Sequence, residues 1–260
     1  MTYTYFPGCT LRTKAKDLDH YLRISAEKLG MELIEPADWQ CCGGAYSNAK
    51  DEIANKLSSV RIIMDADKNT GKVLTVCSAC HNVLKRVNDD LKNDENFAFK
   101  VNNYMKPEVP YSGNVEVIHF LEALRDEVGF DKLASMVVKP FTGKKIAAYY
   151  GCLLLRPGKV MAMDDPENPV IMENFIKAIG GTPVIYARRN ECCGGYAVME
   201  DPAIAAKRSG AIIENAKDMG ADLMVTACPL CMYNLKKTGP DTGIYYFTEL
   251  LAEALGLKED

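Results

Sequence analysis

The sequence predicts an α/β protein made of two pseudo-symmetric repeats, each a mainly parallel sheet flanked by helices. Three observations lead to this fold class. The 260 residues have a globular composition, with 48% hydrophobic and 25% charged residues. One pattern of cysteines occurs twice, and β-rich runs alternate with helical periodicity in the same order in both halves. We therefore expect two domains, residues 1–141 and 142–260, with a boundary near Pro140–Gly143.

Each half carries five cysteines at corresponding places, and the two sets use all ten. A single cysteine comes first, a Cys-Cys-Gly-Gly block follows, and a Cys-x-x-Cys motif begins after 34 further residues. The first set is Cys9, Cys41, Cys42, Cys77 and Cys80, and the second set is Cys152, Cys192, Cys193, Cys228 and Cys231.

The first elements of each half surround its first cysteine. β-rich runs at Thr2–Phe6 and Lys145–Tyr150 lead directly into Cys9 and Cys152. Apolar residues at helical spacing follow, as in Leu18, Leu22 and Leu29, and glycines then suit the C-terminal ends of these helices. A brief strand precedes each Cys-Cys pair, and a second helix follows it; the strands are expected at Glu32–Ile34 and Pro183–Tyr186.

A third strand delivers each Cys-x-x-Cys motif to the start of a third helix, and a fourth strand leads into a final helix. The expected third strands are Lys72–Val76 and Asp222–Thr226, and the expected fourth strands are Val115–Ile118 and Ile244–Phe247. The polar stretch Lys92–Asn114 is interpreted as a long excursion or a partner-binding loop. The second half has extra residues of its own at Asp164–Pro169.

The cysteines are expected just beyond the C-terminal ends of parallel strands, where open α/β sheets place their sites. Backbone N–H groups at helix starts favour thiolate there. A lone Cys-x-x-Cys motif is shared by zinc sites, thioredoxin-like motifs and clusters, but the five-cysteine pattern occurring twice indicates metal binding. Structural zinc and cubane clusters both take four ligands, so the fifth cysteine suggests a more open cluster.

Composition and motifs also exclude several classes. The net charge of −4 argues against nucleic-acid binding. The N-terminus does not resemble a secretory signal, and no apolar stretch approaches the ~20 residues that span a bilayer. We expect a cytoplasmic protein without direct membrane contact. The sequence carries no evident flavin or nicotinamide fingerprint such as Gly-x-Gly-x-x-Gly.

The sequence resembles the cysteine-rich CCG-domain family, and within it the catalytic CCG-domain subunit of heterodisulfide reductase from methanogenic archaea. The most specific elements are Phe6-Pro7-Gly8-Cys9, the two Cys-Cys-Gly-Gly blocks, Cys77-Ser-Ala-Cys80-His81-Asn82 and Cys228-Pro-Leu-Cys231. The resemblance implies that each set of five cysteines holds a non-cubane [4Fe-4S] cluster. It also implies two-electron reduction of the mixed disulfide of coenzyme M and coenzyme B, each cluster supplying one electron.

The resemblance implies partners as well: the ferredoxin-like and flavin-containing subunits of heterodisulfide reductase and, more distantly, a hydrogenase or formate dehydrogenase. The alternative is an electron-transfer subunit of another CCG-type oxidoreductase, linked to lactate, glycolate, succinate or a quinone. Lactate-utilisation relatives tend to continue the Cys-Cys-Gly block with Gln-Pro, whereas both blocks here continue with Gly. A third reading is a zinc-stabilised scaffold, which would contain zinc and no acid-labile sulfide.

The expected substrate is anionic, so basic residues near the cysteines are candidates for binding it, with solvated surface charge as the alternative for each. The candidates are Arg12, Lys14, Arg156, Lys159, Arg188 and Arg189. Lys85-Arg86 and Lys236-Lys237 are interpreted as facing solvent or a partner. His81, beside Cys80, is a candidate proton donor to a departing thiolate, with a hydrogen-bonding or solvent role as the alternative.

Overall fold

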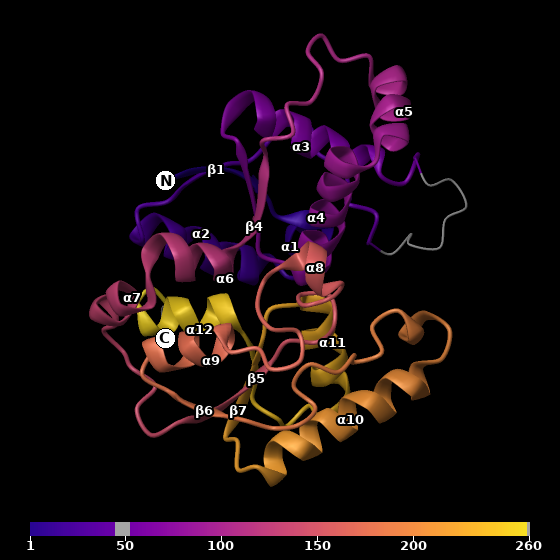
Figure 1. Ribbon diagram of the computed structural model, residues 1–260. Helices are drawn as coiled ribbons and strands as arrows, with labels where there is room; N and C mark the ends of the chain where they lie inside the picture. The colour runs from indigo at the N-terminus through magenta and orange to yellow at the C-terminus, as the bar shows by residue number, and fades with distance from the viewer. Residues whose placement is uncertain (45–52, 259–260) are drawn as a thin grey trace.

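A computed structural model describes residues 1–44 and 53–258, and it contains two four-stranded sheets with the same topology (Figure 1). The strand orders are β2-β1-β3-β4 and β6-β5-β7-β8, and all neighbouring strands run parallel. The strands are β1 (Thr2–Phe6), β2 (Glu32–Ile34), β3 (Lys72–Thr75), β4 (Glu116–His119), β5 (Lys145–Tyr149), β6 (Thr182–Val184), β7 (Leu223–Thr226) and β8 (Ile244–Tyr246). The predicted fold class is confirmed.

The repeat extends to the register of the strands. Thr4 of β1 is paired with Ile34 on one side and Val73 on the other. In the second sheet Ala147 of β5 takes the same place, paired with Val184 and Met224. The central strands β1 and β5 are buried after their first residue, as expected for parallel strands covered on both faces.

Helices cover both sheets and fill the connections between parallel strands (Figure 1). The first half contains α1 (Gly8–Thr13), α2 (Lys16–Lys28), α3 (Leu57–Asn69), α4 (Ser78–Asn93), α5 (Glu95–Met105), α6 (Phe120–Ala123), a π-helical turn at Leu124–Val128 and α7 (Phe130–Met136). The second half contains α8 (Gly158–Met161), α9 (Ile171–Ala178), a 3₁₀ turn at Ala197–Met199, α10 (Pro202–Asp218), α11 (Pro229–Thr238) and α12 (Phe247–Ala254).

The expectation of a loop at Lys92–Asn114 is wrong for its first part, which forms the end of α4 and the whole of α5. Asp94 begins α5 by accepting a hydrogen bond from the backbone N–H of Phe97 at 3.0 Å. Phe97 and Val101, one turn apart, are buried, and the ammonium group of Lys56 lies 4.8 Å from the centre of the Phe97 ring. Two apolar anchors and a cap therefore stabilise a helix in a stretch whose overall polarity suggested a loop.

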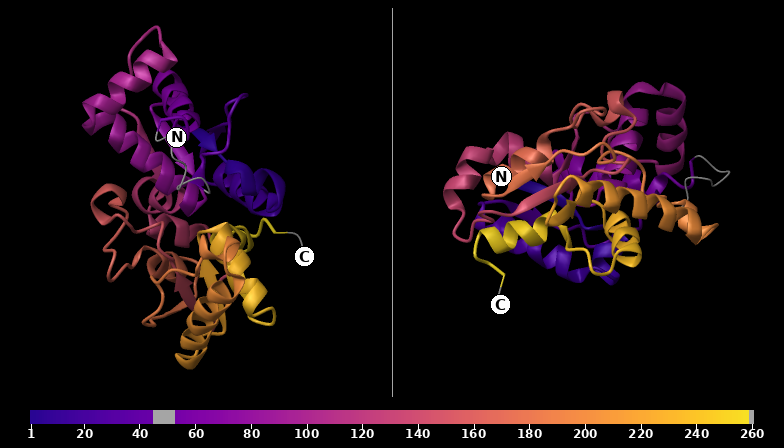
Figure 2. Two further views of the ribbon diagram at one scale, coloured as in Figure 1. Left: turned by 90° about the vertical axis from the view of Figure 1, so that its right-hand side faces the viewer. Right: turned by 90° about the horizontal axis from the view of Figure 1, so that it is seen from below.

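One hydrophobic cluster contains residues of both halves, and a second, smaller cluster lies within the second half. The C-terminal helix α12 packs along α2 of the first half, and α7 packs along α9 of the second half (Figure 2). At the centre, the ring of Phe247 lies 6.1 Å from the rings of both Phe120 and Phe175. Each half thus covers the other with its last helix. The division into domains at residues 141 and 142, between α7 and β5, stays a prediction.

No helix within the described ranges is long and apolar enough to cross a bilayer.

Candidate metal centre

Five of the cysteines lie where strands end and helices begin, whereas the other five lie in turns and loops. Cys9 is the second residue of α1, directly after β1. Cys77 and Cys228 have extended backbones and immediately precede α4 and α11. Cys80 and Cys231 follow in the first turns of these helices, so backbone N–H groups without helical partners surround the sulfur atoms. This is the placement that the sequence predicts.

Within the first set, the sulfur atoms form two close pairs. The Sγ atoms of Cys9 and Cys41 are 3.6 Å apart, and those of Cys42 and Cys80 are 3.5 Å apart.

The second set repeats the pair formed by Cys42 and Cys80, because the Sγ atoms of the corresponding residues Cys193 and Cys231 are 3.6 Å apart. The backbone N–H of Gly194 donates to Cys192 Sγ at 3.3 Å. All ten cysteines are free thiols. Across residues 1–44 and 53–258, no three cysteine, histidine or carboxylate side chains are arranged to hold a metal ion.

Two glycines leave space for the sulfur atoms of Cys80 and Cys231. Gly8 has φ +77°, and a Cβ atom at that position would lie 2.6 Å from Cys80 Sγ. Gly151 takes the same place in the second half, with φ +66° and a Cβ distance of 3.1 Å to Cys231 Sγ. Because a side chain there would push the thiol aside, the backbone forms a cradle that fits a sulfur-ligated group.

The electrostatics of the thiols also suit metal ligation. Hydrogen bonding from Cys41 lowers the pKa of Cys42, and hydrogen bonding from Cys152 lowers the pKa of Cys192. One thiolate in each set is thereby stabilised by its neighbour. Thiolate is the form that binds metal.

Matched serines support both Cys-Cys blocks. Ser59 of α3 and Ser209 of α10 are fully buried, and each Oγ donates to the backbone carbonyl of the second cysteine of its pair at 3.3 Å. Sequence reasoning missed these serines, although each lies at a similar distance after its Cys-Cys pair.

The two cysteine sets meet at the centre of the molecule. Cys231 and then Cys77 lower the pKa of the Cys228 thiol, and Cys228 raises the pKa of Cys77, so thiols of the two sets lie close enough to interact. Behind them, Ser78 donates through its backbone N–H and its Oγ to the carbonyl of Ala227 at 3.2 and 2.7 Å. The two Cys-x-x-Cys turns are therefore fixed back to back.

Tyr246 reinforces this junction. Its buried hydroxyl lies 2.6 Å from the carbonyl oxygen of Val76 and 2.9 Å from that of Ala227. These carbonyls belong to the residues that precede Cys77 and Cys228, one from each half. Sequence reasoning missed this residue too, because the contact joins segments 170 positions apart.

Two adjoining cavities open beside the cysteines. One is apolar and is lined mainly by the second set, including Cys152, Cys193 and Cys228. The other, of about 170 Å³, begins at Cys42. Leu153 and Tyr196 line both cavities, so the two adjoin.

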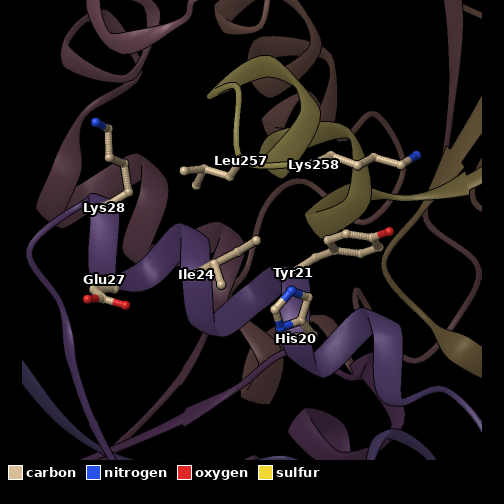
Figure 3. A pocket seen from close by; sticks show the side chains of 7 residues that line it. All are labelled: His20, Tyr21, Ile24, Glu27, Lys28, Leu257 and Lys258. Carbon is tan, nitrogen blue, oxygen red and sulfur yellow. The ribbon is translucent and has the colours of Figure 1, made fainter. Parts of the chain in front are cut away.

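A wider depression of about 920 Å³ lies elsewhere, between α2 and the C-terminal segment, with Lys28 and Lys258 at its edge (Figure 3). It contains no cysteine.

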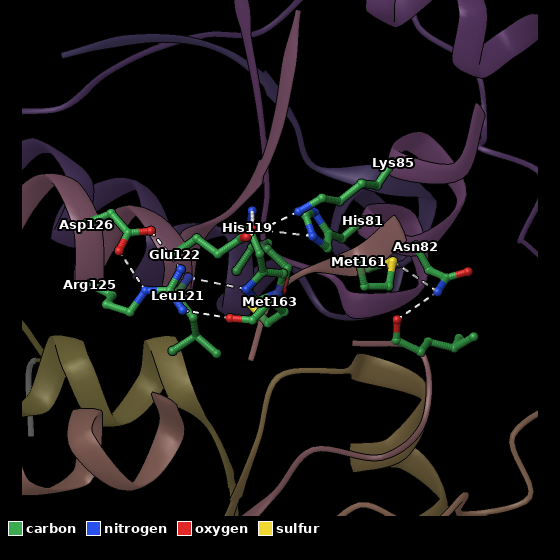
Figure 4. A network of polar contacts seen from close by, with 12 residues as sticks. His81, Asn82, Lys85, His119, Leu121, Glu122, Arg125, Asp126, Met161 and Met163 are labelled. Atoms are coloured by element: carbon green, nitrogen blue, oxygen red, sulfur yellow. Dashed lines mark hydrogen bonds and ion pairs between the residues drawn. The ribbon is translucent and has the colours of Figure 1, made fainter. Parts of the chain in front are cut away.

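His81, the residue after Cys80, is completely buried in a polar network (Figure 4). Its Nε2 atom lies 3.4 Å from Glu122 Oε2, and Lys85 Nζ lies 3.2 Å from Glu122 Oε1. Burial lowers the pKa of His81 well below its usual value, and the neighbouring His119 adds to this shift. The neutral imidazole is therefore favoured at pH 7, and the role of His81 as a proton donor stays a prediction.

The six basic residues predicted to bind substrate lie apart from both cavities, and four of them are engaged elsewhere. Arg189 is buried with Glu173, 3.3 Å away, and Arg12 lies 3.3 Å from Glu35. Arg156 and Arg188 lie 2.8 Å from Glu167 and Glu191, respectively, whereas Lys14 and Lys159 are exposed. Their role in binding stays a prediction.

One basic residue interpreted as facing solvent or a partner does reach the site. Arg86 is exposed and lines the cavity that begins at Cys42. The signal available in the sequence was its position six residues after Cys80, which places it two turns along α4.

The fold and the paired cysteine sets define a duplicated cysteine-rich α/β protein whose two candidate metal centres meet between its halves. The chain belongs to the CCG cysteine-rich domain family, whose profile matches residues 3–85 and 146–236.

Comparison with known proteins gives two kinds of relative along nearly the whole chain. The membrane anchor subunit of 8-methylmenaquinol:fumarate reductase from Wolinella succinogenes is 31% identical, covering 98% of this chain and 92% of that protein. One subunit of a ferredoxin/F420H2-dependent CoB-CoM heterodisulfide reductase from Methanosarcina acetivorans is 29% identical, covering 98% of this chain and 89% of that protein.

A hypothetical protein from Helicobacter pylori has the same fold, with a TM-score of 0.78 at 14% identity. The match covers 99% of this chain and 49% of the Helicobacter chain, so this chain spans about half its length.

Proposed function

We propose that the chain is an iron–sulfur subunit of an oxidoreductase complex, with one cluster held by each set of five cysteines. The paired sulfur atoms, the glycine cradles and the stabilised thiolates support this proposal. The two kinds of relative are both subunits of named reductases. Five ligands per site favour the open, non-cubane type of [4Fe-4S] cluster over a four-ligand cubane.

The proposed reaction is reduction of a disulfide to two thiols: R–S–S–R′ takes up two electrons and two protons and gives R–SH and R′–SH. An iron–sulfur cluster ordinarily supplies one electron at a time. The observation that carries the proposal is the junction of the two Cys-x-x-Cys turns, where Ser78 donates two hydrogen bonds to the carbonyl of Ala227, because this junction would bring two one-electron centres close together. The substrate proposed from the relatives is the heterodisulfide of coenzyme M and coenzyme B.

The chain's own residues would bind and orient the disulfide. Leu153, Tyr196 and Leu230 form an apolar wall beside the cysteines, which keeps water away from the sulfur atoms. Backbone N–H groups at the starts of α4 and α11 would hydrogen-bond to thiolate and stabilise negative charge at the site.

A second candidate function is electron transfer within a quinol-linked reductase, without disulfide chemistry. The relative from Wolinella favours it, because its 31% identity extends over nearly the whole chain. In this case the two cysteine sets would serve as consecutive stations of an electron path, and no small substrate would bind beside them.

The proposed partners are a ferredoxin-like subunit that donates electrons directly and a flavin-containing subunit that supplies them in turn, fed by a hydrogenase or formate dehydrogenase. Purification of the tagged chain from its own organism under anaerobic conditions should recover these proteins. Recovery of a flavoprotein of the fumarate reductase type would support the second candidate instead.

The decisive experiment gives the reduced complex either the heterodisulfide or fumarate and measures thiols, succinate and re-oxidation. We expect two thiols per disulfide and no succinate. Cys193→Ser should abolish thiol formation and lower the iron content. Full turnover in Cys193→Ser, or re-oxidation by fumarate alone, would contradict the proposed reaction.

A further inference from the structure

We propose that the cavity between Cys42 and Arg86 binds the anionic tail of a thiol or disulfide, with Arg86 as the cation that holds it. This inference rests on the proposed function and adds to it the residue that holds the charged end of the substrate and the direction in which the substrate lies. It assigns the role to a residue outside the six basic residues that the sequence singled out.

The cavity has the size and position for a short tail. Its volume of about 170 Å³ corresponds to several water molecules at about 30 Å³ each. Cys42 and Gly44 line it, and so do Asn55, Lys56 and Arg86. A tail that starts at the cysteines can therefore end at the arginine.

Arg86 is the group that would select for an anion, because the neighbouring lysines are paired with carboxylates. Lys56 is neutralised by Asp90, whose Oδ2 lies 2.9 Å from Lys56 Nζ. Lys85 does not line the cavity and pairs with Glu122, whose Oε1 lies 3.2 Å from Lys85 Nζ. Arg86 has no carboxylate partner among residues 1–44 and 53–258, and its planar guanidinium suits carboxylate, sulfonate and phosphate groups.

In the wall of this cavity, the carboxamide oxygen of Asn82 is a hydrogen-bond acceptor that the rest of the side chain holds in place. The side chain is 3% exposed, and its amide nitrogen donates to the carbonyls of Leu153 and Arg156 at 2.8 and 2.7 Å. Both contacts use the nitrogen, and the carboxamide oxygen is directed away from them (Figure 4). A tail carrying an amide N–H or a hydroxyl beside its anionic group would be held by Asn82 as well.

The neighbouring apolar cavity gives the substrate its direction. Leu153 and Tyr196 form the shared wall between this cavity, lined by cysteines, and the polar one that ends at Arg86. An amphipathic molecule would place its sulfur atoms at this shared wall, next to the cysteines, and its charge at Arg86, because the apolar cavity itself, of about 20 Å³, is too small to take the sulfur atoms in. Tyr196, 40% exposed at the junction, would pack against the part between them.

The second half does not repeat this arrangement, which makes it a control. Lys237 occupies the position of Arg86, six residues after the last cysteine of its set. Its Nζ lies 5.8 Å from the centre of the Tyr233 ring, and the cavity that it lines contains no cysteine.

The test measures binding of two small thiols to the anaerobic complex by calorimetry. The probes are 2-mercaptoethanesulfonate and 2-mercaptoethanol, which differ in charge at the end away from sulfur. We expect the wild type to bind the sulfonate at least about tenfold more tightly, because a charge-assisted hydrogen bond would form only with it. Arg86→Gln should remove this preference, Arg86→Lys should keep part of it, and Lys237→Gln should leave it unchanged.

Equal affinities of the wild type for the two thiols, or a preference that survives in Arg86→Gln, would overturn the inference. Disulfide turnover, assayed in the same preparations, tests the proposed function separately. A wild type that prefers the sulfonate through Arg86 but reduces no disulfide would contradict the proposed function and leave the anion site established.

Discussion

Gly8 tests whether the close approach of the backbone to Cys80 builds the first cysteine site. In Gly8→Ala the new methyl group would lie 2.6 Å from Cys80 Sγ, well inside van der Waals contact. Cys80 is buried, so its sulfur cannot move away without displacing its neighbours. We expect the variant to fold less stably and to lose the metal of the first set.

The magnitude has two parts. The left-handed conformation, with φ +77°, costs an alanine about 1–2 kcal/mol. Overpacking against the sulfur adds about 1–3 kcal/mol. The sum is about 2–5 kcal/mol, and in a protein of this size each kcal/mol lowers the melting temperature by roughly 2–4 °C.

Two matched variants separate these parts. Gly30 has φ +75° with nothing within 4 Å of the position that a Cβ would take, so Gly30→Ala measures backbone strain alone. In Gly151→Ala the contact with Cys231 Sγ is longer, 3.1 Å, and an intermediate effect is expected. The assay is thermal unfolding of the anaerobic protein together with its iron content. The reasoning is refuted if Gly8→Ala is no less stable than Gly30→Ala and keeps all its iron.

Two further predictions concern the centre of the fold. Tyr246→Phe removes a buried hydroxyl that serves the carbonyls of Val76 and Ala227, so it should cost about 1–3 kcal/mol in the free energy of unfolding; a neutral result would show that these contacts do not tie the halves together. Burial lowers the pKa of His119 to about 3, so the folded state binds fewer protons than the unfolded state below pH 6.5, and stability should fall by up to about 2 kcal/mol from pH 6.5 to 5. His119→Asn should reduce this slope in chemical denaturation without removing it, because the buried His81 also has a lowered pKa. An unchanged slope in His119→Asn would contradict the assignment.

The repeat allowed much of the fold to be predicted from the sequence. The start of each strand could be placed within one residue because β-rich runs end at cysteines or follow glycines. The sequence does not predict that the last helix of each half packs on the other half. The helix α12 is as apolar as a helix that covers its own half would be. The helix α5 was not predicted because polar residues surround its two buried apolar residues, Phe97 and Val101.

The candidate site could likewise be predicted from the sequence only in part. The two cysteine sets followed from spacing, which fixes where strand ends bring residues together. The contact between Cys77 and Cys228 depends on how the halves pack, and spacing along the chain carries no record of that. Some basic residues that are near the cysteines in the sequence form ion pairs with nearby carboxylates, as Arg189 does with Glu173. Arg86 lies at the cavity because its position along α4 places it there.

The claim that two sets of five cysteines hold two iron–sulfur clusters is tested most directly by counting iron, zinc and acid-labile sulfide in the protein purified without oxygen. We predict about eight irons and about eight sulfides per chain, with no zinc. One or two zinc ions per chain without acid-labile sulfide would contradict the account.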